Sequence, residues 1–211
     1  MLSKGSERKS AEEFIPGDAS IQILREAVQL CRGCDLYRRA TQAVFGEGPP
    51  SSRIVFIGEQ PGDQEDRVGR PFVGPAGRLF DRALQEAGID RSHIYVSNAV
   101  KHFKFEERGK RRIHKKPNAS EAAACRPWLE AELAIIQPEI IVGLGATAAQ
   151  ALFGPDYRLT QHRGNFRLHP WAPHATSTIH PSAILRASGD QRRHEYRDFV
   201  EDLMKVKARL L

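Results

Sequence analysis

The 211-residue sequence has few cysteines and no long apolar run, and each shortage excludes a class of protein. Only three cysteines occur. An odd number with one close pair argues against a disulfide framework and favours metal or redox chemistry in a reducing compartment. No apolar run approaches the ~20 residues that a membrane helix needs, and the first twenty residues lack the apolar stretch of a secretory signal. We therefore expect a soluble, cytoplasmic protein without a membrane partner.

Size and composition indicate one globular domain. Hydrophobic residues make up 40% of the chain and charged residues 27%, which are ordinary globular values and exclude collagen-like or wholly disordered proteins. A chain of this length is typical of one domain and can bury ~70% of its unfolded surface. We expect a flexible tail over residues 1–18 and a single domain over residues 19–211, present as a monomer because nothing in the sequence demands a dimer.

The positive charge is concentrated in one segment. Lys and Arg number 32 against 26 Asp and Glu, a formal net charge of +6. Residues 101–116 hold eight cations and two anions, so a basic loop over residues 101–117 accounts for the whole excess. Focused positive charge is typical of proteins that hold a phosphate backbone. A solvated loop or a localisation signal is the alternative, but the interleaved Phe103, Phe105 and Ile113 count against a mere address tag.

Short β-branched runs alternate with helical patterns along the chain. The runs predict strands over residues 54–57, 94–96, 140–142 and 176–179. Apolar stripes predict helices near residues 19–31, 79–87, 128–136 and 191–209. This alternation predicts an α/β fold, a single three-layer α/β/α domain with a central four-stranded, mainly parallel sheet.

The third of these helices carries two local signals. Asn118-x-x-Glu121 resembles a capping box, which would satisfy the first amides of a helix. Pro127 lacks a backbone N–H, and we expect it to start or kink this helix.

Polar turns follow the predicted strands. Glu59 comes after the first strand, Asn98 after the second and His180 after the fourth. Because ligands bind beyond the carboxyl ends of parallel strands, we expect this carboxylate, amide and imidazole to meet at one rim beside the basic loop. Gly143-x-Gly145 mimics a dinucleotide fingerprint but lacks the acidic residue expected about 20 positions later, so we interpret it as tight helix-to-strand packing.

The cysteines favour a metal site. Cys31-x-x-Cys34 ends a predicted helix, whereas a thioredoxin-like dithiol would follow a strand. Cys125 supplies a third thiolate, and His102 is the candidate fourth ligand. Zinc and an iron–sulfur cluster both suit such a site, and ligand softness alone does not separate them.

Read together, several segments resemble the family 4 branch of the uracil-DNA glycosylase superfamily, and within it the UdgX group. The resemblance spans the chain from Cys31 to the final helix. It rests on GEQPGDQED (58–66), GRPFVGPAGR (69–78), NAVK (98–101), CRP (125–127) and HPSAILR (180–186). The segment KRRIHK (110–115) resembles the insertion that marks the UdgX group.

This resemblance implies a [4Fe-4S] cluster, with zinc as the alternative. The implied ligands are Cys31, Cys34, His102 and Cys125. Family 4 members typically hold the cluster with four cysteines, so a histidine at the fourth position, His102, departs from that pattern. Gln60 is a second departure, because typical members carry a small residue there; with the basic insertion it alters the space beside Glu59.

The resemblance also implies how uracil would be held. Phe72 offers a π face to the extruded base, and Asn98 offers a donor and an acceptor to its Watson–Crick edge. A neutral His180 at a helix start would donate to uracil O2 as negative charge develops there. The other expected substrate contacts are Gly58, Gln60 and Arg186. The expected contacts to the DNA backbone are Lys110, Arg111 and Arg112.

On the sugar side, Glu59 would stabilise an oxocarbenium-like deoxyribose while His114 competes with water for C1′. Our hypothesis from the resemblance is that His114 stays bonded to the abasic sugar, which makes a single-use enzyme. A conventional multiple-turnover family 4 glycosylase is the alternative, and a non-catalytic nucleic-acid-binding module is a rival from another class. The expected partner is uracil-containing DNA, as a single strand, with free uracil as product and nucleoid association when bound.

Overall fold

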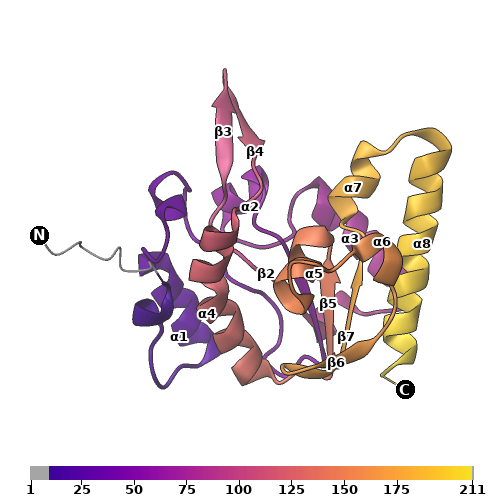
Figure 1. Cartoon of the computed structure of the whole chain (residues 1–211), viewed down its shortest axis with the longest axis horizontal. Coiled ribbons are helices and arrows are strands. Elements are labelled where there is room, and N and C mark those ends of the chain that lie inside the picture. The colour runs from indigo at the N-terminus through magenta and orange to yellow at the C-terminus, as the bar shows by residue number, and fades with distance from the viewer. Residues whose placement is uncertain (1–9, 211) are drawn as a thin grey trace, which may run out of the picture.

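The four predicted β-branched runs lie on parallel strands at the centre of the molecule (Figure 1). In the computed structural model, which describes residues 10–210, these strands are β1 (Ile54–Gly58), β2 (Ile94–Asn98), β5 (Ile140–Leu144) and β7 (Ala172–Thr178). A fifth strand, β6 (Arg167–His169), runs antiparallel to β7 at the edge and gives the order β2-β1-β5-β7-β6. The mainly parallel α/β fold is confirmed. The expected count of four strands was low by one, because β6 has three residues and no apolar pattern.

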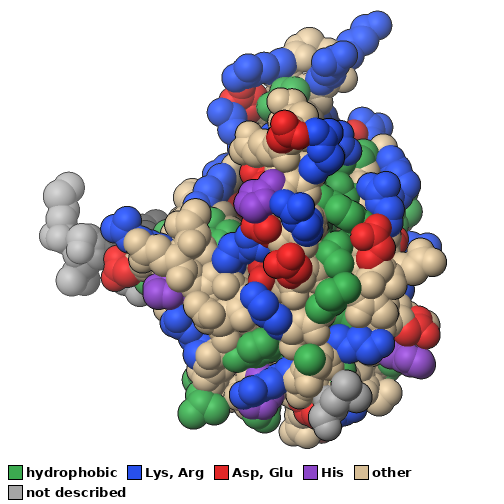
Figure 2. Space-filling view, turned by 90° about the vertical axis from the view of Figure 1, so that its right-hand side faces the viewer, with side chains coloured by type: hydrophobic (Ala, Val, Ile, Leu, Met, Phe, Trp, Pro, Cys, Tyr) green, Lys and Arg blue, Asp and Glu red, His purple; other side chains and the backbone are tan. Residues whose placement is uncertain are grey.

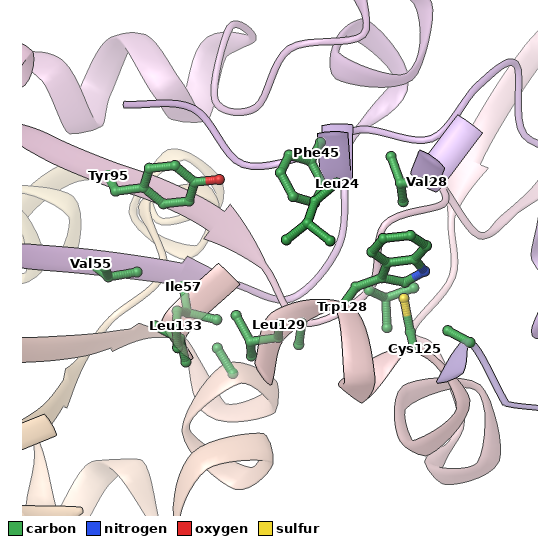
Figure 3. Close-up of a cluster of buried hydrophobic side chains, with 14 of the residues drawn as sticks. Leu24, Val28, Phe45, Val55, Ile57, Tyr95, Cys125, Trp128, Leu129 and Leu133 are labelled. Atoms are coloured by element: carbon green, nitrogen blue, oxygen red, sulfur yellow. The ribbon is translucent and has the colours of Figure 1, made fainter. Parts of the chain in front are cut away.

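Both faces of the sheet are buried, so successive side chains of each strand enter two different cores. On β1, Val55 and Ile57 face one core, and Ile54 and Phe56 face the other. The first core, shown in Figure 3, packs under α1 (Ile21–Ala27), α4 (Ala119–Ile136) and α5 (Ala146–Phe153). The second packs under α3 (Pro75–Glu86), α7 (Pro181–Arg186) and α8 (Gly189–Ala208). This two-sided burial explains why β1 and β5 read as continuous apolar runs.

Helix boundaries follow local signals. The Ser20 hydroxyl accepts a hydrogen bond from the Ile23 amide and caps α1. The capping box of Asn118 and Glu121 is confirmed, and α4 begins directly after it. Pro127 lies inside α4 and does not start it, because the cap fixes the first turn well before it; the alternative expectation, a kink at Pro127, stays a prediction. Within residues 10–210, no helix combines the length and apolarity needed to cross a membrane.

The remaining helices are short. They are η1 (Glu12–Phe14), η2 (Val28–Leu30), η3 (Asp35–Arg38), α2 (Asp63–Val68), η4 (Arg91–His93) and α6 (Leu159–His162). The predicted tail over residues 1–18 lies partly outside the described residues. That tail stays a prediction; among the described residues, Ala11 is 1% exposed and its amide donates to the Ala124 carbonyl at 2.8 Å.

The basic segment contains a β-hairpin rather than a simple loop. β3 (Phe105–Arg108) pairs antiparallel with β4 (Arg111–His114), which places Phe105 opposite His114. Gly109 opens the two-residue turn with a φ of +57°, a conformation that favours glycine. The hairpin projects from the domain (Figure 1), and Lys and Arg side chains gather at its tip (Figure 2).

Candidate active site

The carboxyl ends of the parallel strands open onto one cavity of about 720 Å³. Glu59 lines it after β1, Asn98 at the end of β2 and His180 after β7, while His114 enters from β4. The expected meeting of a carboxylate, an amide and an imidazole at this edge is confirmed. The chemical roles of these groups stay predictions.

Phe72 and Asn98 pack against the end of β1. A Cβ on Gly58 would lie 2.3 Å from Asn98 Oδ1 and 2.9 Å from Phe72 Cζ, so the glycine leaves room for both groups. Phe72 itself has a φ of +56°, and a Cβ on Gly77 in α3 would fall 1.7 Å from the Phe72 carbonyl oxygen. A left-handed backbone at a non-glycine residue is costly and persists only where packing enforces it. The close approach of α3 therefore fixes an aromatic face beside a polar amide.

His180 is held as a neutral ring. The Ser182 amide donates to His180 Nδ1 at 3.1 Å, which leaves the proton of the neutral imidazole on Nε2. Burial lowers the pKa of His180 to about 4, with Arg186 and His114 acting in the same direction. Its ring centroid lies 6.2 Å from that of Phe72, with 29° between the planes. The site thus has an N–H donor and an aromatic face at the same wall of the cavity.

Glu59 and His114 face one another in the same cavity. His114 Nε2 lies 3.4 Å from Glu59 Oε1, and the two side chains are 50% and 19% exposed. Burial lowers the pKa of His114 below its ordinary value; the Glu59 carboxylate opposes this effect and Arg186 adds to it. A neutral imidazole with a carboxylate in reach is an arrangement that can act as a nucleophile or as a base.

Gln60 closes the base of the hairpin that carries His114. Its amide nitrogen donates to the carbonyls of Lys104 at 3.1 Å and Lys115 at 3.0 Å, and its amide oxygen accepts from the Lys104 amide at 2.9 Å. Gln60 lines the cavity, but its amide is committed to the hairpin. The expected role of Gln60 as a substrate contact stays a prediction beside this role in the hairpin.

Arg112 holds the hairpin from the other side. Its guanidinium donates to Asp63 and, at 2.6 Å, to the fully buried Asp66, and it lies 4.9 Å from the centroid of the Phe105 ring. These partners engage the guanidinium in the protein without DNA; a contact between Arg112 and a DNA phosphate stays a prediction. Its neighbour Arg111 is exposed, as is Lys110 at the turn. Sequence reasoning missed this network, although both carboxylates lie in the GEQPGDQED segment.

The three cysteine thiols lie in the first core and are buried and free of disulfides. Burial raises the pKa of the Cys125 thiol to about 12, Lys101 opposes this, and the charges of Cys34 and Cys31 contribute to it. Trp128, labelled beside Cys125 in Figure 3, donates from its indole nitrogen to Cys31 Sγ at 3.2 Å. The thiols therefore share one electrostatic environment that already contains an N–H donor to sulfur.

His102 is 4% exposed, and burial lowers its pKa to about 4 against the opposing charge of Asp66. The ring is therefore neutral, which is the form that binds metals. No group of three or more His, Cys, Asp or Glu side chains in residues 10–210 is arranged to hold a metal ion. The ligand role of His102 and of the three cysteines stays a prediction.

A buried ion pair joins the cysteine region to Asn98. Lys101 Nζ lies 2.5 Å from Glu132 Oε2, and the two side chains are 0% and 1% exposed. The same ammonium donates to the Asn98 carbonyl at 2.9 Å, while the Lys101 amide donates to Cys125 Sγ at 3.2 Å. Glu132 Oε1 also accepts from the Tyr95 hydroxyl at 3.0 Å. No sequence pattern pointed to this pair.

Comparison with known proteins gives a consistent family. A model described as "Uracil DNA glycosylase superfamily" matches residues 45–204. The type-4 uracil-DNA glycosylase of Thermotoga maritima is 39% identical over 189 residues, which cover 89% of this chain and 93% of that protein. The type-4 enzyme of Sulfurisphaera tokodaii is 35% identical over 174 residues, covering 79% and 76%. The type-5 enzyme of Thermus thermophilus is 30% identical over 185 residues, covering 78% of each.

The fold has a counterpart among solved structures. The crystal structure of SMUG2 from Pedobacter heparinus superposes with a TM-score of 0.51 at 12% identity, and the match covers 76% of each chain. At that identity the likeness concerns the arrangement of strands and helices.

Proposed function

Because the chain belongs to the uracil-DNA glycosylase superfamily, we propose that it excises uracil from DNA and then bonds through His114 to C1′ of the abasic sugar. The observation that carries this proposal is the 3.4 Å approach of His114 to Glu59 in the cavity that also holds Phe72, Asn98 and His180. A conventional multiple-turnover glycosylase is the second candidate. The names of the type-4 relatives favour it, and in it His114 would act as a base toward water rather than as the nucleophile.

At the base end, uracil stacks on Phe72 and presents its polar edge to the Asn98 amide. The glycosidic bond breaks with its electron pair going to uracil, and negative charge develops on O2. His180 donates from Nε2 to that oxygen without changing its own protonation, because its pKa of about 4 keeps the ring neutral near neutral pH.

At the sugar end, the Glu59 carboxylate stabilises the cationic deoxyribose. A lone pair of the His114 imidazole forms the bond to C1′, and the proton on its other nitrogen passes to Glu59. The hairpin restraints at Gln60 and Arg112 keep the ring in the cavity before the sugar arrives. In this proposal the bond between the ring and the sugar is not hydrolysed, so each molecule acts once.

A gel experiment tests the proposal. A labelled single strand with one deoxyuridine is incubated with excess protein, denatured and separated, with a thymidine strand as the matched control. We expect a retarded, heat-stable band from the uracil strand alone, and one free uracil for each molecule in that band. Repeated uracil release without a band would favour the conventional glycosylase. Equal binding of both strands without uracil release would favour a non-catalytic module.

We also propose that Cys31, Cys34, His102 and Cys125 hold a [4Fe-4S] cluster. Three buried thiols in one environment, an indole N–H on Cys31 and a backbone N–H on Cys125 support a thiolate-rich centre. The cluster would tie the Cys31–Cys34 turn and the Lys101 segment to α4. Iron and sulfide in equal amounts in anaerobically purified protein would support this assignment, and zinc in their place would overturn it.

For DNA contacts, we propose that the exposed Lys110 and Arg111 hold phosphates of a single strand and that Arg186, at the rim of the cavity, contacts the substrate. Such charge contacts weaken as salt rises. Association with the nucleoid would follow from the same contacts.

Replacing Gln60 with alanine should separate adduct formation from uracil excision. The change removes three hydrogen bonds at the base of the hairpin but leaves Phe72, Asn98 and His180 in place. We expect adduct formation to slow about tenfold, the equivalent of one or two neutral hydrogen bonds, while uracil release changes little. Adduct and free uracil are measured in the same samples, and an equal decline of both would contradict the restraint role.

Adduct formation should tolerate mild acid. Only the neutral imidazole has a free lone pair, and the pKa of His114 is lowered by burial. We therefore expect the adduct rate to stay level as pH falls through about 6.5, the ordinary histidine value, and to decline only at lower pH. In Glu59→Gln, which lacks the opposing carboxylate, the decline should move to still lower pH. A wild-type rate that halves near pH 6.5 would contradict this assignment.

A further inference from the structure

A second hollow of about 380 Å³ is lined by α4, α5 and Glu59, and Glu59 also lines the catalytic cavity. Its walls are mostly small apolar side chains, among them Ala123 on α4 and Ala151 on α5. Glu59, Lys116 and Thr147 line both hollows, so the two meet along one rim. We call this second hollow the α4–α5 groove.

The lining of the groove suits an aromatic ring joined to a phosphate. Lys116 is exposed on the shared rim, and Arg126 lines the groove with its guanidinium 5.0 Å from the centroid of the Trp171 ring. Arg126 also pairs with Glu130 at 2.8 Å, which leaves Lys116 as the better placed cation for a phosphate. Apolar and aromatic walls accept any base through its flat face, while cations follow the backbone.

We propose that the α4–α5 groove binds the base of the nucleotide next to the target uridine. This inference rests on the proposed function, because it assumes a uridine in the catalytic cavity. A neighbour in the same strand is one sugar–phosphate unit away, and the two hollows share a rim at Glu59, Lys116 and Thr147. In a duplex that neighbour is paired and stacked, so the groove would select single strands.

Affinity for a non-cleavable strand tests the groove. A fluorescein-labelled oligonucleotide carries 2′-fluoro-2′-deoxyuridine, whose electron-poor sugar resists bond cleavage. In two further strands, an abasic tetrahydrofuran unit replaces either the 5′ or the 3′ neighbour. We expect one of these replacements to weaken wild-type binding about tenfold, as base stacking contributes in single-strand binders, and the other to have little effect.

Filling the groove with a larger side chain is a second, independent test of the proposal. Ala123→Phe changes an exposed helix position in the groove, and Ala134→Phe is the matched control at an exposed position of α4 that lines neither hollow. Ala123→Phe should bind the intact strand about tenfold more weakly and lose nothing more when the neighbouring base is removed. Ala134→Phe should bind like the wild type.

Two results would overturn the inference: a wild type that binds all three strands equally, or an Ala123→Phe variant that binds the intact strand with full affinity. Uracil release from an ordinary deoxyuridine strand is followed separately. If the binding pattern holds without release, the groove stands as a nucleotide site and the proposed enzymatic function fails.

Discussion

Replacing His114 with alanine should abolish the denaturation-resistant band completely while uracil release continues. The imidazole is the group placed 3.4 Å from Glu59, and its removal leaves a space that water can enter. Phe72, Asn98 and His180, which we propose hold the base, come from other elements and are unchanged. Attack by water would then yield a free abasic site, and the variant should turn over repeatedly. The measurement is the denaturing gel combined with the ratio of free uracil to protein.

Arg111→Ala is the matched control on the same strand, because Arg111 is exposed while His114 faces the cavity. This variant should keep the band and lose affinity mainly as salt is raised. A persistent band in His114→Ala would place the covalent bond elsewhere and refute the nucleophile assignment. A variant that neither forms the band nor releases uracil would make His114 essential for excision and contradict the division between the base and sugar ends.

The fold and the residues at the rim of the site could be predicted from the sequence, because both depend on local patterns. Apolar runs marked the four parallel strands, and the polar residues that end them had to meet at one edge. β6 was not predicted, because it forms only by pairing with β7 at the edge of the folded sheet. The capping box at Asn118 could also be predicted from a local pattern, because its hydrogen bonds span three residues.

The contacts by which Gln60 and Arg112 hold the hairpin could not be predicted from the sequence, because their partners lie far along the chain. Gln60 bonds Lys104 and Lys115, and Arg112 bonds Asp66, so a single sequence gives no sign of these contacts. A run of charges predicts that each of its cations faces solvent or a phosphate. Arg112 instead packs against carboxylates and aromatic rings of the protein. Tertiary pairing, rather than local propensity, decides which cation of the hairpin supports His114.

Replacing Lys101 with methionine should lower the free energy of unfolding by about 3–5 kcal/mol. The substitution keeps much of the volume of the side chain but leaves the carboxylate of Glu132 without its cation at 1% exposure. The Asn98 carbonyl also loses a donor, so uracil binding should weaken together with stability. Urea denaturation followed by circular dichroism measures the change, as a lower midpoint at an unchanged slope.

Two comparisons separate the unpaired charge from lost packing. Arg53→Met breaks the Arg53–Glu139 pair, whose side chains are 54% and 49% exposed, and should cost no more than about 1 kcal/mol. Adding Glu132→Gln to Lys101→Met should recover part of the loss, because a neutral amide can still accept from the Tyr95 hydroxyl without burying a charge. If the double variant is less stable than Lys101→Met alone, an uncompensated carboxylate is not the cause. The pair would then contribute through its hydrogen-bond geometry across β2 and α4.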